Sequence, residues 1–163
     1  MLFIIDRNQY RYKKYCYSSN LPFLLFPVEL RRRICNHPCL LVPSYDQILA
    51  LDFGNKTSYS VISNLTKAAA LDFHHNLGYI FWSDVTEHNI KRLHIQSNSI
   101  KTTISGIGVC DGLAVEWRSS KLYWSDTTYD RISISDLDGN NQRTIVSSEL
   151  EEPRAIALDL DNR

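Results

Sequence analysis

The sequence predicts an all-β protein built from repeated four-stranded antiparallel sheets, which is the architecture of an incomplete β-propeller. Three observations predict this fold. The tripeptide Trp-Ser-Asp occurs at residues 82–84 and again at residues 124–126, a spacing of 42 residues. The segments around both copies recur with it, and no window of a dozen residues has the periodicity of an amphipathic helix. A repeat of this length indicates one supersecondary unit that is used several times.

The segment before each tripeptide recurs in three copies: Ala-Ala-Ala-Leu-Asp-Phe at 68–73, Gly-Leu-Ala-Val-Glu-Trp at 112–117 and Ala-Ile-Ala-Leu-Asp-Leu at 155–160. The central alanines of these copies are 44 and 43 residues apart. A further element, Val-Ile-Ser-Asn-Leu at 61–65, returns in related form near residues 105 and 147. Several elements in register over three copies indicate a true repeat and exclude chance similarity.

The repeated elements have the composition of strands joined by tight turns. Residues 80–82 and 122–124 are short aromatic and aliphatic runs, and residues 132–135 alternate apolar with polar side chains. The segment 138–141 contains Asp-Gly, a strong hairpin signal. Four short strands per period of about 40–45 residues are typical of a propeller blade, whereas competing repeats of this length are mostly helical.

Charge divides the chain of 163 residues into two parts. Residues 1–40 contain no repeat and carry a net charge of +5, and we predict a leader of uncertain structure there. Residues 41–163 carry a net charge of −5 and are predicted to form the partial propeller. The acidic repeat region argues against nucleic acid as a partner and favours a basic protein ligand. No stretch approaches the roughly 18–20 apolar residues of a membrane span.

Two interpretations of the leader stay open: a signal peptide, and a poorly ordered leader or sequence that does not belong to the domain. Its apolar run at residues 21–28 follows a basic stretch, as in a signal peptide, but it is short and contains two prolines.

The cysteines do not form a zinc-site pattern, because Cys35 and Cys39 are a lone pair, and no metal site is predicted. Unpaired or incidentally paired thiols are expected, with Cys110 unpaired in a loop. The histidines are expected to be exposed and uninvolved.

Residues 111–139 resemble the YWTD repeat. Leu-Tyr-Trp-Ser-Asp at 122–126 is preceded by Gly-Leu-Ala-Val-Glu-Trp and followed by Arg-Ile and Leu-Asp-Gly. That repeat builds the six-bladed β-propellers of the low-density-lipoprotein-receptor family, and the resemblance covers about residues 41–163. Residues 83–92 resemble the first propeller of the Wnt co-receptors, and residues 70–85 resemble the agrin-binding relative equally well. The resemblance implies an extracellular receptor module at the plasma membrane.

The repeat motif itself is predicted to be structural. The aromatic pair Tyr123 and Trp124 would turn toward opposite neighbouring blades, because successive strand residues point to opposite faces. Trp82 and Trp124 would each bury more than about 100 Å² between blades. Asp84 and Asp126 follow strand ends, where a carboxylate satisfies free backbone N–H groups, and this favours a structural role over a catalytic or metal-binding one.

Ligand-binding residues are predicted on loops of one propeller face, because adjacent blades present equivalent loops around a common axis. The resemblance implies six such positions, which are Val85, Thr86, His88, Asp111, Thr128 and Arg154. His88 and Thr128 stand where the Wnt co-receptors have glutamates, so the ligand specificity differs from theirs. The implied partners are secreted proteins that are Wnt-type, Wnt antagonists or agrin-like. Membrane attachment would come only through parts of a full receptor outside this chain.

Two sequons predict N-glycosylation at Asn55 (Asn55-Lys56-Thr57) and at Asn64 (Asn64-Leu65-Thr66), and both fit a secreted context. We expect no cofactor and no enzymatic activity. A Ca²⁺-dependent propeller hydrolase is an alternative, but it requires carboxylates and asparagines at equivalent loop positions of every repeat, and these are missing. A WD-repeat scaffold would need Gly-His before the strands and Trp-Asp at their ends, and neither occurs.

A truncated, non-functional fragment is the remaining alternative. At this period a closed six-bladed ring needs about 250 residues, whereas the repeats account for about two and a half blades. An open set of blades exposes apolar faces and unpaired strand edges. We therefore expect this chain alone to be marginally stable or prone to aggregation.

Overall fold

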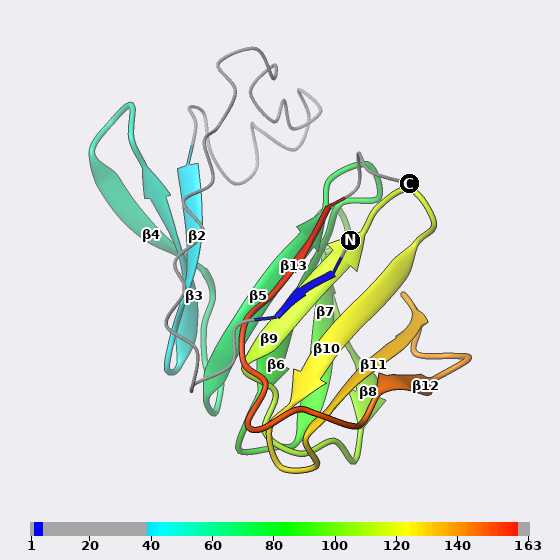
Figure 1. Ribbon diagram of the computed structural model, residues 1–163. Helices are drawn as coiled ribbons and strands as arrows, with labels where there is room; N and C mark the ends of the chain where they lie inside the picture. Colours follow the sequence, from blue (N-terminus) through cyan, green and yellow to red (C-terminus); the bar gives the residue numbers. More distant parts are fainter. Residues whose placement is uncertain (1, 5–38, 160–163) are drawn as a thin grey trace.

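The computed structural model describes residues 2–4 and 39–159, and every regular element in these residues is a β-strand (Figure 1). In this part of the chain no helix is long and apolar enough to cross a membrane. The strands form three antiparallel sheets and one short pair, so the predicted all-β class and blade organisation are confirmed. The predicted division at residue 40 stays a prediction, because nearly all of the leader lies outside the described residues.

The strands follow one another in sequence order within each sheet. Sheet 1 contains β2 (Cys39–Ser44), β3 (Gln47–Asp52) and β4 (Thr57–Ile62). Sheet 2 contains β5 (Ala68–His74), β6 (Tyr79–Asp84), β7 (Asn89–His94) and β8 (Ser99–Ser105). Sheet 3 contains β9 (Gly112–Glu116), β10 (Lys121–Asp126), β11 (Arg131–Asp136) and β12 (Arg143–Val146). The last strand, β13 (Ile156–Leu158), pairs antiparallel with β1 (Leu2–Ile4).

Sheet 1 has three strands among the described residues, where four per blade were expected. A register shift shows which strands correspond between sheets. It occurs after Ile48 in β3, after Ile90 in β7 and after Ile132 in β11, at intervals of the 42-residue repeat. β2, β3 and β4 therefore match β6, β7 and β8, and no described strand of sheet 1 matches β5.

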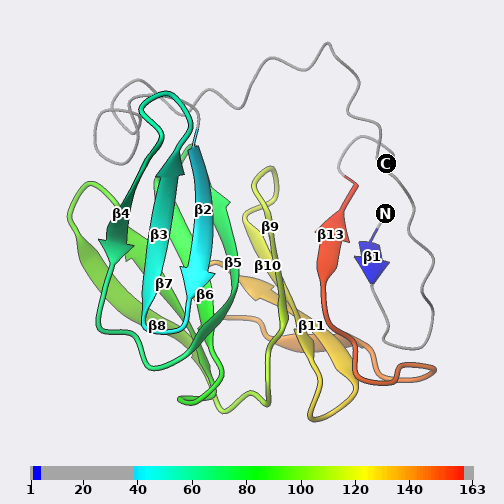
Figure 2. The same cartoon turned by 90° about the vertical axis from the view of Figure 1, so that its left-hand side faces the viewer.

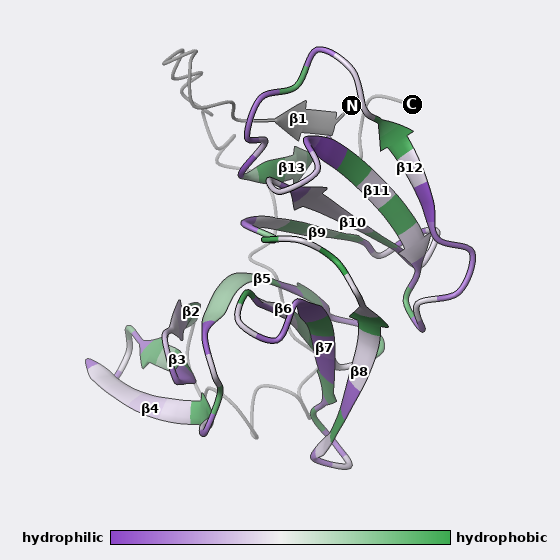
Figure 3. Ribbon diagram, turned by 90° about the horizontal axis from the view of Figure 1, so that it is seen from below, coloured by the Kyte–Doolittle hydropathy of each residue, from purple (hydrophilic) through white to green (hydrophobic). Residues whose placement is uncertain are grey.

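The sheets are arranged side by side with their first strands adjacent. β5 contacts β9, and β9 contacts β13. Figure 2 shows this succession from the β2–β4 sheet to β13, and Figure 3 shows β4, β8 and β12 at the outer ends of their sheets. This arrangement is that of successive propeller blades, with first strands nearest the axis.

Apolar side chains fill the spaces between neighbouring sheets. One cluster joins sheets 1 and 2 and includes Ile48, Ile62 and Trp82. A second cluster joins sheets 2 and 3 and includes Phe81 and Trp124. Each sheet thus contributes side chains to the core on one or both of its faces, and no sheet has an apolar core of its own.

The motif tryptophans are buried at these junctions. Trp82 is 0% exposed and Trp124 is 2% exposed. Phe81, the neighbour of Trp82 in β6, lies in the opposite cluster, because successive residues of a strand point to opposite faces. Tyr123, beside Trp124, is only partly buried. Burial on this scale makes large-to-small substitution of either tryptophan cost about 3–5 kcal/mol.

The two cysteines among the described residues lie in different environments. Cys39 is disulfide-bonded, whereas Cys110 is free and buried in the loop before β9, as expected for an unpaired thiol. Cys16 and Cys35 lie outside the described residues.

The expectation of exposed, uninvolved histidines is confirmed in exposure for His88 and is wrong for the other described histidines. His74 is buried, and its Nδ1 accepts a hydrogen bond from the Leu77 N–H at 3.2 Å in the turn after β5. His75 packs its ring on Trp117 and His94 bonds Ser97, and both are partly buried.

Candidate functional site

Five loops meet at the end of the sheets where β6 and β10 finish, and we call this end the loop face. It consists of residues 63–67, 85–88, 106–111, 127–130 and 147–155. All six predicted binding positions lie on it: Val85, Thr86 and His88 in the β6–β7 turn, Asp111 before β9, Thr128 in the β10–β11 turn and Arg154 before β13. Thr86, His88 and Thr128 are exposed, and the other three are partly buried.

Asp84 holds two of these loops in place. Its Oδ2 accepts hydrogen bonds from the N–H groups of Thr66 and Lys67, at 3.2 and 3.3 Å. Its Oδ1 accepts from the N–H groups of Thr86 and Glu87, both at 3.1 Å. The side chain is 1% exposed, so the carboxylate satisfies backbone donors and is not offered to a ligand.

Asp126 has the equivalent position in sheet 3. Its Oδ2 accepts from the Gly108 N–H at 3.1 Å, and its Oδ1 accepts from the N–H groups of Thr128 and Tyr129 at 3.2 and 3.3 Å. Arg131 adds an ion pair at 3.1 Å. A Cβ on residue 108 would lie 2.2 Å from Asp126 Oδ1, so only glycine allows the loop to approach this carboxylate so closely.

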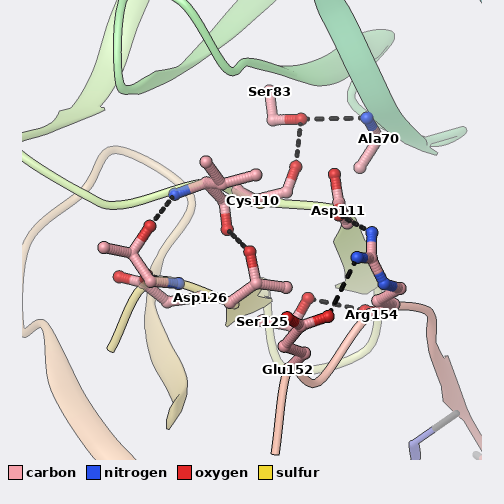
Figure 4. Close-up of polar contacts among 11 residues, drawn as sticks. Ala70, Ser83, Cys110, Asp111, Ser125, Asp126, Glu152 and Arg154 are labelled. Atoms are coloured by element: carbon pink, nitrogen blue, oxygen red, sulfur yellow. Dashed lines mark hydrogen bonds and ion pairs between the residues drawn. The ribbon is translucent and has the colours of Figure 1, made fainter. Parts of the chain in front are cut away.

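The serine of each motif links neighbouring sheets, a role that the sequence analysis did not assign to it. Ser83 Oγ donates to the Cys110 carbonyl at 2.8 Å and accepts from the Ala70 N–H at 2.9 Å (Figure 4). Ser125 Oγ donates to the Arg154 carbonyl at 2.6 Å. These bonds place the segments that carry Asp111 and Arg154 against the preceding sheet.

Arg154 bridges two carboxylates on the loop face. Its Nη1 lies 2.5 Å from Asp111 Oδ2 and its Nη2 lies 3.2 Å from Glu152 Oε2 (Figure 4). The Arg154 side chain is 43% exposed. Two of the predicted binding positions are therefore joined directly, and a ligand carboxylate or cation would have to compete with this ion pair.

Glu87 is a charged loop-face residue that the sequence analysis did not select. Its carboxylate accepts hydrogen bonds from Thr66 Oγ1 at 2.8 Å and from Asn89 Nδ2 at 3.0 Å, and it lies 2.6 Å from Lys91 Nζ. The bonds from Lys91, Asn89 and Thr66 lower the pKa of Glu87 to about 2. Its position directly after Thr86 was the available sequence signal.

Tyr129 is the second residue that the sequence analysis missed. It is 59% exposed beside Thr128, and the Arg131 guanidinium lies 4.7 Å from its ring centroid. Thr128 Oγ1 accepts a hydrogen bond from the Val109 N–H at 2.9 Å, which fixes the turn against the neighbouring loop. Exposed tyrosines are enriched among residues that dominate protein interfaces. An aromatic in a predicted turn was the signal that could have found it.

Among residues 2–4 and 39–159 no group of three His, Cys, Asp or Glu side chains is placed to hold a metal ion. The hydrolase alternative therefore gains no support from the described part of the chain.

The chain is similar in sequence to a known repeat family and to receptor-related proteins. Residues 120–160 match the low-density lipoprotein receptor repeat class B. Low-density lipoprotein receptor-related protein 5 of mouse is 36% identical over 127 residues, and the human protein is equally similar over the same length. The chain contains a class B repeat of the low-density-lipoprotein-receptor type. The match covers 75% of this chain but 8% of either relative.

Solved structures support the same fold for the class B repeats. The crystal structure of a nidogen/laminin complex contains a β-propeller that aligns with a TM-score of 0.66 at 23% identity, covering 71% of this chain and 47% of that chain. An auxiliary nutrient binding protein from Bacteroides thetaiotaomicron aligns with a TM-score of 0.59 at 15% identity, over 70% of this chain and 28% of that chain. At these identities the likeness establishes the fold alone.

Proposed function

We propose that this chain is a ligand-binding segment of a receptor propeller, and that its loop face binds secreted protein ligands outside the cell. The observation that carries the proposal is the convergence of the six candidate positions from four loops onto one end of the structure. The motif carboxylates and serines hold these loops rigidly, so little ordering would be needed when a ligand binds.

Charge on the loop face supports a ligand with a basic binding segment. The five loops contain six carboxylates and two basic side chains, namely Glu87, Asp111, Asp130, Glu149, Glu151 and Glu152 against Lys67 and Arg154. An acidic surface attracts a basic partner over long range and raises the association rate. Nucleic acid, which is acidic, would be repelled.

The candidate ligands are Wnt-type proteins, Wnt antagonists and agrin-like proteins. Similarity to low-density lipoprotein receptor-related protein 5 supports a receptor role. The module would act at the extracellular face of the plasma membrane as part of a longer receptor, without cofactor and without catalysis.

Tyr129→Ala tests the loop face directly, with Tyr59→Ala as the matched control. Tyr59 is also exposed but lies on β4, outside the loop face. Binding of each candidate ligand to the immobilised chain would be measured by surface plasmon resonance at several salt concentrations. We expect Tyr129→Ala to weaken the Kd about 10-fold or more and Tyr59→Ala to leave it unchanged. Equal effects of the two variants would place the ligand elsewhere.

A further inference from the structure

The sequon at Asn64 lies on the loop face. Asn64 is exposed in the loop between β4 and β5, and its side chain makes no hydrogen bond within residues 39–159. The two residues that follow Asn64 are held in place, because the Leu65 N–H donates to the Asp46 carbonyl at 2.8 Å and the Thr66 N–H donates to Asp84 Oδ2 at 3.2 Å. The Asn64 amide is thus presented to solvent from a fixed loop.

Backbone geometry explains the asparagine but not the rest of the sequon. Asn64 has a φ of 60°, and its counterparts Gly106 and Glu149 have φ values of 72° and 59°. The position therefore requires a left-handed conformation, which asparagine adopts more readily than most residues. No backbone requirement explains the threonine at position 66, because Gly108, its counterpart before sheet 3, makes the same N–H bond to the motif aspartate. The Thr66 hydroxyl completes the sequon and also donates to Glu87 Oε1.

The second sequon lies at the opposite end of sheet 1. Asn55 is exposed in the turn between β3 and β4, where its N–H donates to Asp52 Oδ1 at 3.2 Å. The β2–β3 turn packs against the β4–β5 loop through the Leu65 and Ala68 N–H groups, so the loop face and the Asn55 turn are at opposite strand ends. A glycan on Asn55 would leave the loop face open.

We propose that Asn64 carries an N-linked glycan that covers the loop face beside the β6–β7 turn and restricts which ligands reach Thr86 and His88. The two loops are in direct contact through the Thr66–Glu87 and Lys67–Val85 hydrogen bonds. A branched oligosaccharide attached two residues from Thr66 therefore occupies solvent in front of that turn. The effect on ligands rests on the proposed function, and glycan attachment rests only on its extracellular location.

The attachment needs a lipid-linked oligosaccharide diphosphate as donor and an oligosaccharyl transferase of the secretory pathway. The Asn64 amide nitrogen forms a bond to the anomeric carbon of the first sugar and loses one proton. The bond between that carbon and the diphosphate oxygen breaks, and the lipid diphosphate leaves with the electron pair. No redox change occurs.

Occupancy would be measured on the full chain, secreted from mammalian cells behind an added signal sequence. Peptide mass spectrometry after enzymatic deglycosylation in ¹⁸O-water marks each occupied asparagine as labelled aspartate. We expect label at residue 64, its loss in Asn64→Gly and its retention in Thr66→Ser. Asn64→Gly keeps the left-handed backbone, as Gly106 does in sheet 2. A secreted chain that is labelled at Asn55 but not at Asn64 would overturn the proposal.

Coverage would be measured without any ligand, by the rate at which amines are acetylated. Lys67 is exposed next to the sequon, and Lys101 on β8 is an exposed control outside the loop face. We expect deglycosylation of the folded wild-type chain, and separately Asn64→Gly, to raise the labelling rate of Lys67 several-fold and to leave Lys101 unchanged. A Lys67 labelling rate that stays unchanged in both cases would refute coverage. The control variant Asn55→Gln should leave the Lys67 labelling rate unchanged.

The effect of the glycan on ligand binding is measured separately, by the affinity of each candidate ligand. We expect Asn64→Gly to strengthen binding of bulky ligands several-fold and Asn55→Gln to have no effect. If Lys67 becomes accessible but no candidate ligand binds either form, the proposed function fails while the glycan proposal stands. If a ligand binds both forms equally well, the glycan does not restrict access.

Discussion

In the two copies of the Trp-Ser-Asp motif the tryptophan and the aspartate make equivalent internal contacts, whereas the surface contacts differ. Trp82 and Trp124 are both buried between sheets, and Asp84 and Asp126 each accept hydrogen bonds from two successive loops. At the surface the copies diverge. The first is followed by Glu87, which pairs with Lys91, whereas in the second the buried Asp126 itself pairs with Arg131.

This difference shows which positions the fold constrains and which are free to change. Internal contacts recur because every sheet must pack on its neighbours and close its loops in the same way. Surface residues are not constrained by that packing, so they vary from copy to copy and can determine which ligand binds. The following variants test that division.

The largest effect is expected from the motif tryptophans. Trp82→Ala and Trp124→Ala should each lower the free energy of unfolding by about 3–5 kcal/mol, because both remove a buried side chain between two sheets. Urea denaturation monitored by circular dichroism measures the loss. Trp117→Ala, in a turn and 37% exposed, is the matched control and should cost less than about 1 kcal/mol. A clear inequality between the two motif variants would break the equivalence of the copies.

Replacing the two motif serines should lower stability by moderately different amounts. Ser83→Ala removes partners from both the Ala70 N–H and the Cys110 carbonyl, which should cost about 1–3 kcal/mol. Ser125→Ala removes a partner from the Arg154 carbonyl and should cost about 1 kcal/mol. Thermal melts of the two variants compare them. If Ser125→Ala is the more damaging variant, the inter-sheet bond of Ser83 contributes less than its geometry indicates.

Asp72 makes the contact between sheets 2 and 3 sensitive to pH. Its Oδ2 accepts the Val115 N–H at 2.6 Å, and burial raises its pKa to about 6. Because the folded pKa lies above the unfolded value, the folded chain binds more protons between about pH 4 and 6, and stability falls as pH rises through that window. We expect a loss of about 1–2 kcal/mol across it.

Asp72→Asn is the variant that tests this effect. It should flatten the dependence of the free energy of unfolding on pH between about 4 and 6, because the amide does not titrate there. Urea denaturation at several pH values measures the slope. An unchanged slope would mean that another group titrates.

The smallest effects are expected from the two ion pairs whose cations are partly exposed. Lys91→Gln removes a pair with the exposed Glu87 and should cost less than about 0.5 kcal/mol. Arg131→Gln leaves the buried Asp126 carboxylate with its three backbone donors, and because the Arg131 side chain is partly exposed the loss should cost about 1 kcal/mol. Raising the salt concentration should weaken the first pair more, since its carboxylate is exposed whereas Asp126 is buried. Equal costs and equal salt responses would contradict the expected difference between the Lys91–Glu87 and Arg131–Asp126 pairs.

Much of the fold could be predicted because its signals are local. The aromatic runs at β6 and β10 and the Asp-Gly turn after β11 each follow from a few consecutive residues. The three-stranded sheet 1 could not be predicted in the same way. Its strands lack the Trp-Ser-Asp signal, and their correspondence to β6–β8 became visible only from the register shift after Ile48.

The six candidate binding positions came from the resemblance, which did not include the loop-face residues Glu87 and Tyr129. Nothing in the sequence separates an exposed loop residue from one that packs back on the sheet. Tyr129 lies in a turn that is closed by Asp126 and held against the neighbouring loop by the bond between the Val109 N–H and Thr128 Oγ1, and the second of these bonds joins residues of different loops. The same limit applied to His74, whose burial depends on a turn closed three residues later.

By itself, the sequence determined the all-β repeat, its 42-residue period and the type of repeat, because the periodicity and turn chemistry that specify strands are written in neighbouring residues. Only the tertiary structure decided which face each side chain occupies and which residues of different blades meet. Ser83 reaches Cys110 and Arg154 reaches Asp111 across 27 and 43 residues of chain. Such contacts depend on how the sheets pack on one another, and no local pattern encodes that packing.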